Sequence, residues 1–297
     1  SYRYRQRLNR SNDSSGNIDN LPTSIDIAGI GVKLGKGFSI FAGKQCTAYG
    51  GIEFDLNPIE IYEYSDMIEN MSNFMTGLNI GYDINAHQQL NLQILDSRNG
   101  SFNKMYGVET EDGEQPTIES GKLPLVYTLN WNGNFNDIFK TRWSASIMNE
   151  AKDKNLYYFA FGNELNLNKF NMFLDFMYSK EGIDRKGIMT GITDSMEGHN
   201  AFDAGYFSMV TKLNYRFLPK WNAFVKGMYE TASLTKQQGD LEKGKYRTAW
   251  GYFAGVEFYP MDTTLHFFLT YVGRSYDFTA RAKALGQENY STNRVSV

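Results

Sequence analysis

The sequence has few cysteines, histidines and prolines, and it has no long apolar run. Its 297 residues include one cysteine, three histidines and six prolines. The lone cysteine, Cys46, cannot form an internal disulfide, so we interpret it as a small packing residue. No apolar stretch reaches the roughly 20 residues that a membrane-spanning helix needs. These absences exclude a disulfide scaffold and a helical membrane protein.

The chain also lacks a basic excess and the motifs of common catalytic or cofactor sites. Lysines and arginines number 30 against 33 acidic residues, which argues against a nucleic-acid partner. There is no glycine-rich phosphate loop, CxxC or HExxH, so we predict no cofactor and no metal. His199 lies near Asp194, Glu197 and Asp203 and could act as a base, but nothing in the sequence supplies an oriented nucleophile. We therefore expect that the protein is not an enzyme.

Aromatic residues, in contrast, are abundant for a chain of such low mean hydropathy. The sequence holds 20 tyrosines and 21 phenylalanines, and many stand in segments of alternating character. Within 139–148, Phe139, Trp143 and Ile147 share one face, opposite Lys140 and Arg142. A repeat of two is the period of a β-strand. A membrane β-barrel explains both features, because its aromatics form girdles at two interfaces while its lumen is polar.

Short turns alternate with longer loops along the whole chain. The short turns are Leu34–Gly37, Ile84–Gln89, Gly133–Asp137, Asn166–Lys169, Leu218–Lys220 and Pro260–Thr264. The longer loops are Arg10–Pro22, Tyr49–Asn73, Arg98–Lys122, Glu150–Asn155, Glu181–Ala204, Ala232–Lys245 and Thr279–Asn289. Short turns on one rim and long loops on the other are typical of an outer-membrane barrel.

We therefore predict an all-β protein, a transmembrane antiparallel β-barrel of the bacterial outer membrane, with fourteen strands in this chain. No linker divides the sequence, so residues 1–297 are expected to form a single domain. A soluble β-sandwich is the alternative, although its loops need not sort by length. Ser1 opens directly into a strand-like stretch and Val297 stops within an alternating run, so we expect both natural ends to be missing.

The polar faces of the predicted strands should point into the lumen, because a base near the bilayer midplane costs about 2–4 kcal/mol. The predicted pore-lining bases are Arg3, Arg5, Arg7, Lys140, Arg142, Lys212, Arg216, Lys226, Arg247, Arg274 and Arg294. The predicted lumen acids are fewer: Asp83, Glu164, Asp175, Glu230 and Glu257. A net basic wall favours anions in a pore. The alternative is that these bases pair with the acids and only make the wall rigid.

The loop Tyr49–Asn73 has a composition of its own. It combines isoleucines and tyrosines with six acids and contains no lysine or arginine; the acids are Glu53, Asp55, Glu60, Glu63, Asp66 and Glu69. Because this loop is so apolar, it is expected to fold into the barrel, pack on the wall and narrow the pore, with its acids facing the basic wall. The alternative is an extracellular surface loop or a subunit contact. Its acids do not have the spacing of an EF-hand calcium site.

Several runs resemble the phosphate-selective porin O and P type family, in its branch from Gram-negative anaerobes. They are Phe41–Gln45, Gly50–Asp55, Asn57–Ser65, Asp96–Phe102 and Glu181–Gly187, and the likeness extends through the chain in strand order. The resemblance implies a porin of about sixteen strands, commonly trimeric, with an inward-folded third loop. In this family dense arginine and lysine ladders give phosphate preference, whereas only Arg3, Arg5 and Arg7 suggest a ladder in this chain.

Together these observations predict a water-filled porin for the passive diffusion of small solutes, with a moderate preference for anions, phosphate among them. Its expected partners are outer-membrane lipid, small anionic solutes, and copies of itself in a homotrimer or other outer-membrane proteins. The alternative is a structural or partner barrel of a larger outer-membrane complex that conducts little. Such a barrel would fill its lumen, which the inward positions expected for Phe173, Phe224, Phe253 and Phe268 would favour.

Overall fold

A computed structural model describes residues 2–6, 23–108, 118–193, 199–261 and 265–297. Its strands are β1 (Tyr2–Gln6), β2 (Thr23–Gly35), β3 (Phe38–Cys46), β4 (Phe74–Asn85), β5 (Gln88–Asp96), β6 (Leu125–Phe135), β7 (Phe139–Ala151), β8 (Lys154–Leu167), β9 (Phe170–Ile183), β10 (Phe202–Leu218), β11 (Trp221–Leu234), β12 (Gly244–Phe258), β13 (Phe267–Phe278) and β14 (Tyr290–Ser296). Its helices are α1 (Ile52–Asp55), α2 (Pro58–Ile61), α3 (Asp66–Glu69), α4 (Phe102–Tyr106), α5 (Ile188–Thr193) and α6 (Ala280–Ala284).

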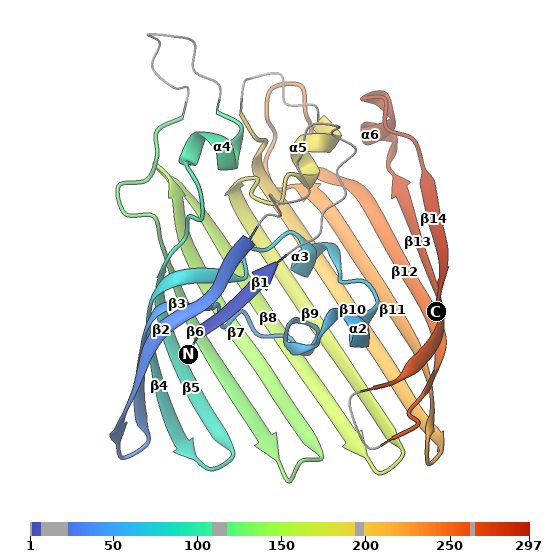
Figure 1. Ribbon diagram of the computed structural model, residues 1–297. Coiled ribbons are helices and arrows are strands. Elements are labelled where there is room, and N and C mark those ends of the chain that lie inside the picture. The colour runs from blue at the N-terminus through green and yellow to red at the C-terminus, as the bar shows by residue number, and fades with distance from the viewer. Residues whose placement is uncertain (1, 7–22, 109–117, 194–198, 262–264) are drawn as a thin grey trace.

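The strands form one sheet in which each strand pairs with the next along the chain. The sheet has fourteen strands in the order β1 to β14, and the pairs β1–β2 and β13–β14 at its two ends are antiparallel like the rest. The sheet is strongly curved (Figure 1). Within the described residues β1 and β14 are its two edges, so this part of the barrel is not closed. The predicted antiparallel all-β architecture and the number of strands are confirmed.

The predicted short turns from 34–37 to 218–220 lie together on one rim, at the bottom of Figure 1, while the turn Pro260–Thr264 falls partly outside the described residues. The turns between β2 and β3 and between β6 and β7 contain left-handed residues, a conformation that asparagine, aspartate and glycine adopt at low cost. In the turn between β6 and β7, Asn136 and Asp137 have φ of 55° and 57°. Asn134 Nδ2 donates a hydrogen bond to Asp137 Oδ1 at 2.6 Å, which closes this turn.

One predicted long loop is in fact a tight turn. The sequence analysis placed a longer loop at 150–155, but β7 continues to Ala151 and β8 begins at Lys154. Only Lys152 and Asp153 lie between the two strands, and Asp153 has a φ of 59°. The prediction was wrong because an aspartate that tolerates a left-handed backbone lets a hairpin close over two polar residues.

Alternation separates two faces of the sheet. Trp143 on β7 is exposed, whereas its neighbour Ser144 is buried and its hydroxyl donates to the carbonyl of Tyr49. On the exposed face aromatic rings from adjacent strands touch: Trp143 contacts Trp131 at 5.1 Å and Phe161 at 5.5 Å between ring centroids. The apolar residues of this face are the ones predicted to meet lipid. Among the described residues no helix is both long and apolar enough to cross a membrane.

The hydrophobic core lies between the concave face of the sheet and the segment that joins β3 to β4. The short helices α2 and α3 of this segment lie in front of β8–β11 in Figure 1. Ile61 and Met67 of the segment belong to the same buried cluster as Phe173 and Phe224 of the wall. The predicted inward fold of this loop therefore agrees with the structure.

The assignment of the two faces predicts a strong asymmetry in tolerance to charge. Leu129 on β6 is exposed on the apolar face. We expect Leu129→Arg to destabilise the protein by about 2–4 kcal/mol relative to Leu129→Ala, because the guanidinium would enter hydrocarbon. Urea unfolding of the protein in lipid vesicles measures this difference. Equal stability of the two variants would contradict the assignment.

Candidate functional site

The segment 47–73 is fixed to the wall where it leaves β3. Thr47 N donates to Asn73 O at 2.9 Å, which closes the base of the loop. Gly50 and Gly51 have positive φ, and Gly51 N donates to Arg142 O on β7 at 3.0 Å. A side chain at Gly50 would approach Arg142 O to 2.9 Å. Glycine is therefore required for the loop backbone to lie directly on the strand.

A wall carboxylate then caps the first helix of the loop. Asp175 on β9 accepts hydrogen bonds from Ile52 N at 2.9 Å and Glu53 N at 2.7 Å. The free N–H groups at a helix start favour a negative partner. Gly162 on β8 makes room, because a Cβ there would lie 2.7 Å from Gly51 Cα. Asp175 was predicted as a lumen acid, and the structure gives it the role of anchoring the loop.

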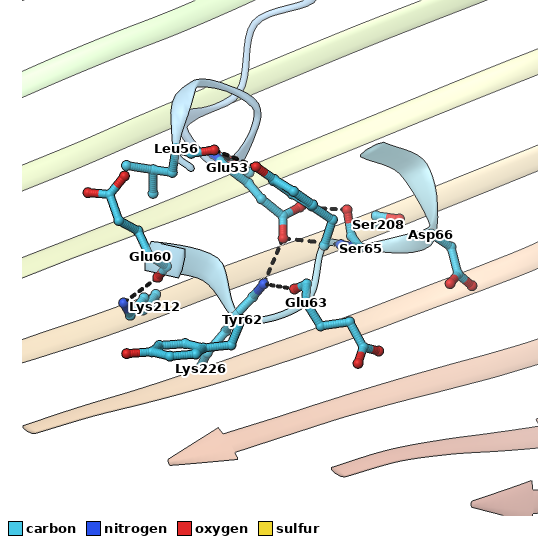
Figure 2. Close-up of polar contacts among 12 residues, drawn as sticks. Glu53, Leu56, Glu60, Tyr62, Glu63, Ser65, Asp66, Ser208, Lys212 and Lys226 are labelled. Carbon is cyan, nitrogen blue, oxygen red and sulfur yellow. Dashed lines mark hydrogen bonds and ion pairs between the residues drawn. The ribbon is translucent and has the colours of Figure 1, made fainter. Parts of the chain in front are cut away.

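The deepest contact is an ion pair between the loop and β11, shown in Figure 2. Lys226 Nζ lies 2.7 Å from Glu53 Oε1, and both side chains are 0% exposed. Lys226 also donates to Glu63 O at 2.6 Å. Ser65 completes the shell of Glu53, donating from N to Oε1 at 3.1 Å and from Oγ to Oε2 at 2.6 Å. Each of the two charges is thus compensated by the other and by hydrogen bonds, as buried charges must be.

A second contact joins the loop to β11 and β12 through Tyr62. Its hydroxyl donates to Glu257 Oε1 at 2.6 Å, and its ring stacks on Phe224 at 4.8 Å. Burial and the adjacent carboxylate both raise the pKa of Tyr62 above its usual value, so the hydroxyl remains a donor. Lys212 Nζ donates to Glu60 O at 2.6 Å and lies 3.8 Å from Glu257 Oε1.

A third contact is a network around Arg274 of β13. Arg274 Nη2 lies 2.6 Å from Glu230 Oε2 and 3.1 Å from Asp66 Oδ1, and its Nη1 lies 3.2 Å from Glu63 Oε1. Arg247 of β12 pairs with the other oxygen of Asp66. Glu230 accepts a hydrogen bond from Asp66 N at 2.7 Å as well. Asp66, the first residue of α3, is therefore held by wall residues of both charges: the bases Arg247 and Arg274 and the acid Glu230.

The predicted bases thus divide into a buried and an accessible group. Lys212, Lys226, Arg247 and Arg274 are buried beneath the loop and paired. The accessible group comprises Lys140, which lies 3.5 Å from Glu164, Arg142, which lies 3.0 Å from Asp55, Arg294, which lies 3.1 Å from Glu63, and the exposed Arg216. Arg3 and Arg5 belong to β1, and Arg7 lies outside the described residues. The pore-lining role of all these bases stays a prediction.

The six acids of the loop divide in the same way. Glu53 is buried and Asp66 and Glu63 face wall arginines, whereas Asp55, Glu60 and Glu69 are exposed. Glu60 stays within the loop, accepting from Asn57 N at 3.0 Å in a capping box at the start of α2. The exposed edge of the loop is therefore acidic.

The sequence analysis missed a cluster of hydrogen bonds and one ion pair at the long-loop end of the sheet, centred on Arg185. Its Nη1 contacts Glu150 at 2.7 and 2.9 Å, and its Nη2 donates to Ser97 O at 2.6 Å and to Ser72 Oγ at 3.0 Å. One guanidinium thereby joins β7, the segments after β5 and β9, and the end of the loop 47–73. The run 181–187 carried the family resemblance, but nothing in its local pattern indicated these distant partners.

No group of His, Cys, Asp and Glu suited to a metal ion occurs in the described part of the chain. His199 stacks on Phe202 at 4.4 Å between centroids. Asp203 forms a 3.0 Å ion pair with Lys236, while Asp194 and Glu197 lie outside the described residues.

Comparison with known proteins identifies the family. A family model described as phosphate-selective porin O and P matches residues 1–297. The chain belongs to this family. The resemblance expected from the sequence is confirmed, and with it the assignment to an outer-membrane β-barrel channel of Gram-negative bacteria.

Solved structures of outer-membrane proteins share the fold. The outer membrane channel DcaP of Acinetobacter baumannii is 11% identical, with a TM-score of 0.62 over 95% of this chain and 75% of that chain. OmpT of Vibrio cholerae is 9% identical, with a TM-score of 0.53 over 92% of this chain and 78% of that chain. At this identity the likeness concerns the fold alone. No curated protein sequence matches the chain significantly.

The Lys226–Glu53 pair predicts a strong dependence of stability on both partners. We expect Lys226→Met to lower the free energy of unfolding by about 3–5 kcal/mol, because Glu53 would stay buried without a counter-charge. The double variant Lys226→Met with Glu53→Gln should recover much of this loss. Urea unfolding of all four members of the cycle gives the coupling energy. Additive effects would mean that the pair does not hold the loop.

Proposed function

We propose that this porin forms a water-filled channel for the passive diffusion of small polar solutes, narrowed by the loop Tyr49–Asn73. The supporting observation is the attachment of this loop to the concave wall by charges of both signs. The loop borders several cavities, among them one of about 570 Å³ toward the short turns and one of about 530 Å³ beside Glu63 and Arg294. The proposed activity requires no catalytic step and no cofactor.

We further propose a moderate preference for anions, set by the accessible bases. Lys212, Lys226, Arg247 and Arg274 meet carboxylates at close range, so each pair contributes little net field to a passing ion. The preference would then depend on Arg142, Arg294 and the other exposed bases, opposed by the acidic edge of the loop. Fixed charges in a narrow, low-dielectric pore concentrate ions of opposite sign.

The Arg142–Asp55 pair offers a direct test of this selectivity. Arg142→Gln should shift the reversal potential in a potassium chloride gradient toward cations, and Asp55→Asn should shift it toward anions. We expect each to change the permeability ratio roughly twofold to fivefold, as an interaction of up to ~1 kcal/mol between charges in water would. Planar-bilayer recordings on single channels measure both the conductance and the reversal potential.

The control is Lys152→Gln, because Lys152 forms a more exposed ion pair with Glu119 at 2.8 Å in the turn after β7, away from the loop. This variant should leave the reversal potential unchanged. A native channel that already prefers cations would contradict the proposed anion preference. A protein that inserts but conducts almost nothing would instead favour the structural or partner barrel.

We also propose a homotrimer whose contacts use the outer face of β2–β5. All four tryptophans of the chain stand on β6, β7, β11 and β12, whereas β2–β5 carry none. Tryptophan and tyrosine mark the lipid interfaces of a barrel. On β2 and β3 the exposed face instead carries small or aliphatic residues such as Ile30, Val32 and Ala42. Apart from the exposed pair Phe38–Tyr82 on β3 and β4, this apolar face is poor in aromatic rings, which suits a neighbouring protein surface better than lipid.

Two bulky substitutions test this assembly. Ala42→Trp should convert trimers to monomers, because the ring would obstruct close packing of β3 against a neighbour. Ala145→Trp on β7 is the control, since it places the same ring on the aromatic face and should leave the assembly unchanged. Light scattering in detergent measures the mass of each. Monomers for the native protein, or trimers for Ala42→Trp, would contradict the proposed interface.

A further inference from the structure

A chain of asparagine side chains crosses the concave face toward the short-turn rim. Asn222 Nδ2 donates to Asn214 Oδ1 at 3.3 Å, and Asn214 Nδ2 donates to Asn171 Oδ1 at 3.0 Å. The chain ends on carboxylates: Asn171 donates to Glu164 Oε1 at 2.7 Å, and Asn222 donates to Glu257 Oε2 at 2.8 Å. Its side-chain hydrogen bonds therefore connect five consecutive strands, β8 to β12, in addition to the backbone pairing of the sheet.

A second, shorter amide chain lies on β4–β6. Asn79 Nδ2 donates to Asn91 Oδ1 at 3.3 Å, and Asn91 Nδ2 donates to Asn130 Oδ1 at 3.2 Å. Asn91 and Asn130 share a cavity with Asp55 and Arg142, the accessible pair at the edge of the loop. Polar but uncharged groups thus occupy the concave wall in two places.

The first amide chain lines the cavity of about 570 Å³ between α2 and the short turns. Three acids and three bases border this cavity, namely Glu60, Glu164, Glu257, Lys169, Lys212 and Arg216. Their formal charges cancel, and Lys212 lies within 3.8 Å of Glu257. An ionic solute would therefore find no net counter-charge here.

The chemistry of the lining matches hydroxyl groups. An amide presents both donors and an acceptor, and each amide oxygen can accept a second hydrogen bond, as a hydroxyl can both donate and accept. Tyr259 and His266 line the same cavity with stacked rings, 5.1 Å between centroids. Such a flat ring surface suits the C–H face of a sugar ring. The volume lies within the roughly 300–1,000 Å³ typical of small-molecule sites.

We propose that this cavity is a binding site for neutral polyhydroxylated solutes, that is, sugars of one or two rings. The inference rests on the proposed function, because it requires that the protein be a channel. This solute class is one that the charge pattern does not indicate. The amide chain binds the sugar hydroxyls by exchanging hydrogen bonds with them, and the balanced formal charges give the site no net counter-charge for an ion.

Sugar-induced block of the single-channel current tests the proposal. Lactose, a neutral disaccharide, should interrupt the current through the native protein in a saturable way. Lactobionate, a disaccharide acid, and inorganic phosphate should block less at equal concentration. Asn214→Ala should raise the half-blocking concentration of lactose by about tenfold, as the loss of one or two hydrogen bonds would.

Asn155→Ala is the matched control. Asn155 also accepts a hydrogen bond from a second asparagine, Asn149, at 3.2 Å, but at the long-loop end of the sheet. The Asn155→Ala variant should leave lactose block unchanged.

Unaltered block in Asn214→Ala, tighter block by lactobionate or phosphate, or no block in a conducting native channel would each overturn the inference. The absence of conductance would overturn the proposed function itself. The comparison of lactose with lactobionate needs only the native protein, so it decides the matter even if Asn214→Ala fails to fold.

Discussion

The buried pair between Lys226 and Glu53 is the constraint on which the interior of this porin depends. Neither side chain reaches solvent, and an uncompensated charge in such a place is very costly. Lys226 of the wall therefore requires Glu53 of the loop as its counter-charge, and Glu53 requires Lys226 in turn. Ser65 and the carbonyl of Glu63 complete the shell, so the middle of the loop is held by a charge and not by apolar packing alone.

The two ends of the loop are held by different means. At its start, glycines bring the backbone onto β7 and Asp175 caps α1. Near its end, Ser72 is held by Arg185, which also contacts Glu150. The loop is thus attached at its start, in its middle and near its end to strands far apart in the sheet. This attachment suits a constriction that must keep its width while solute passes.

Ion pairs between wall bases and nearby acids reduce the net positive charge that the number of lysines and arginines suggests. A large share of the lumen bases neutralises loop or wall acids, so counting them overstates the field that a solute meets. In the proposed channel, the charges left to act on solutes would be those at the edge of the loop, such as Arg142 and Asp55. Amide chains such as Asn171–Asn214–Asn222 add hydrogen-bonding capacity without net charge. The proposed ion preference and the proposed recognition of neutral solutes would therefore reside in different parts of one channel.

The sequence by itself determined the strands, their faces and the membrane setting, because alternation and turn length are local properties of the chain. It also indicated that 49–73 folds inward, since isoleucines and tyrosines beside acids need a partner surface. It misjudged the turn at Lys152 and Asp153, where backbone conformation outweighed the polar run. Only the tertiary structure decided which base meets which acid. Lys226 and Glu53 stand 173 residues apart, and whether they meet depends on how the sheet curves and how the loop folds back across it. No local pattern encodes that distance.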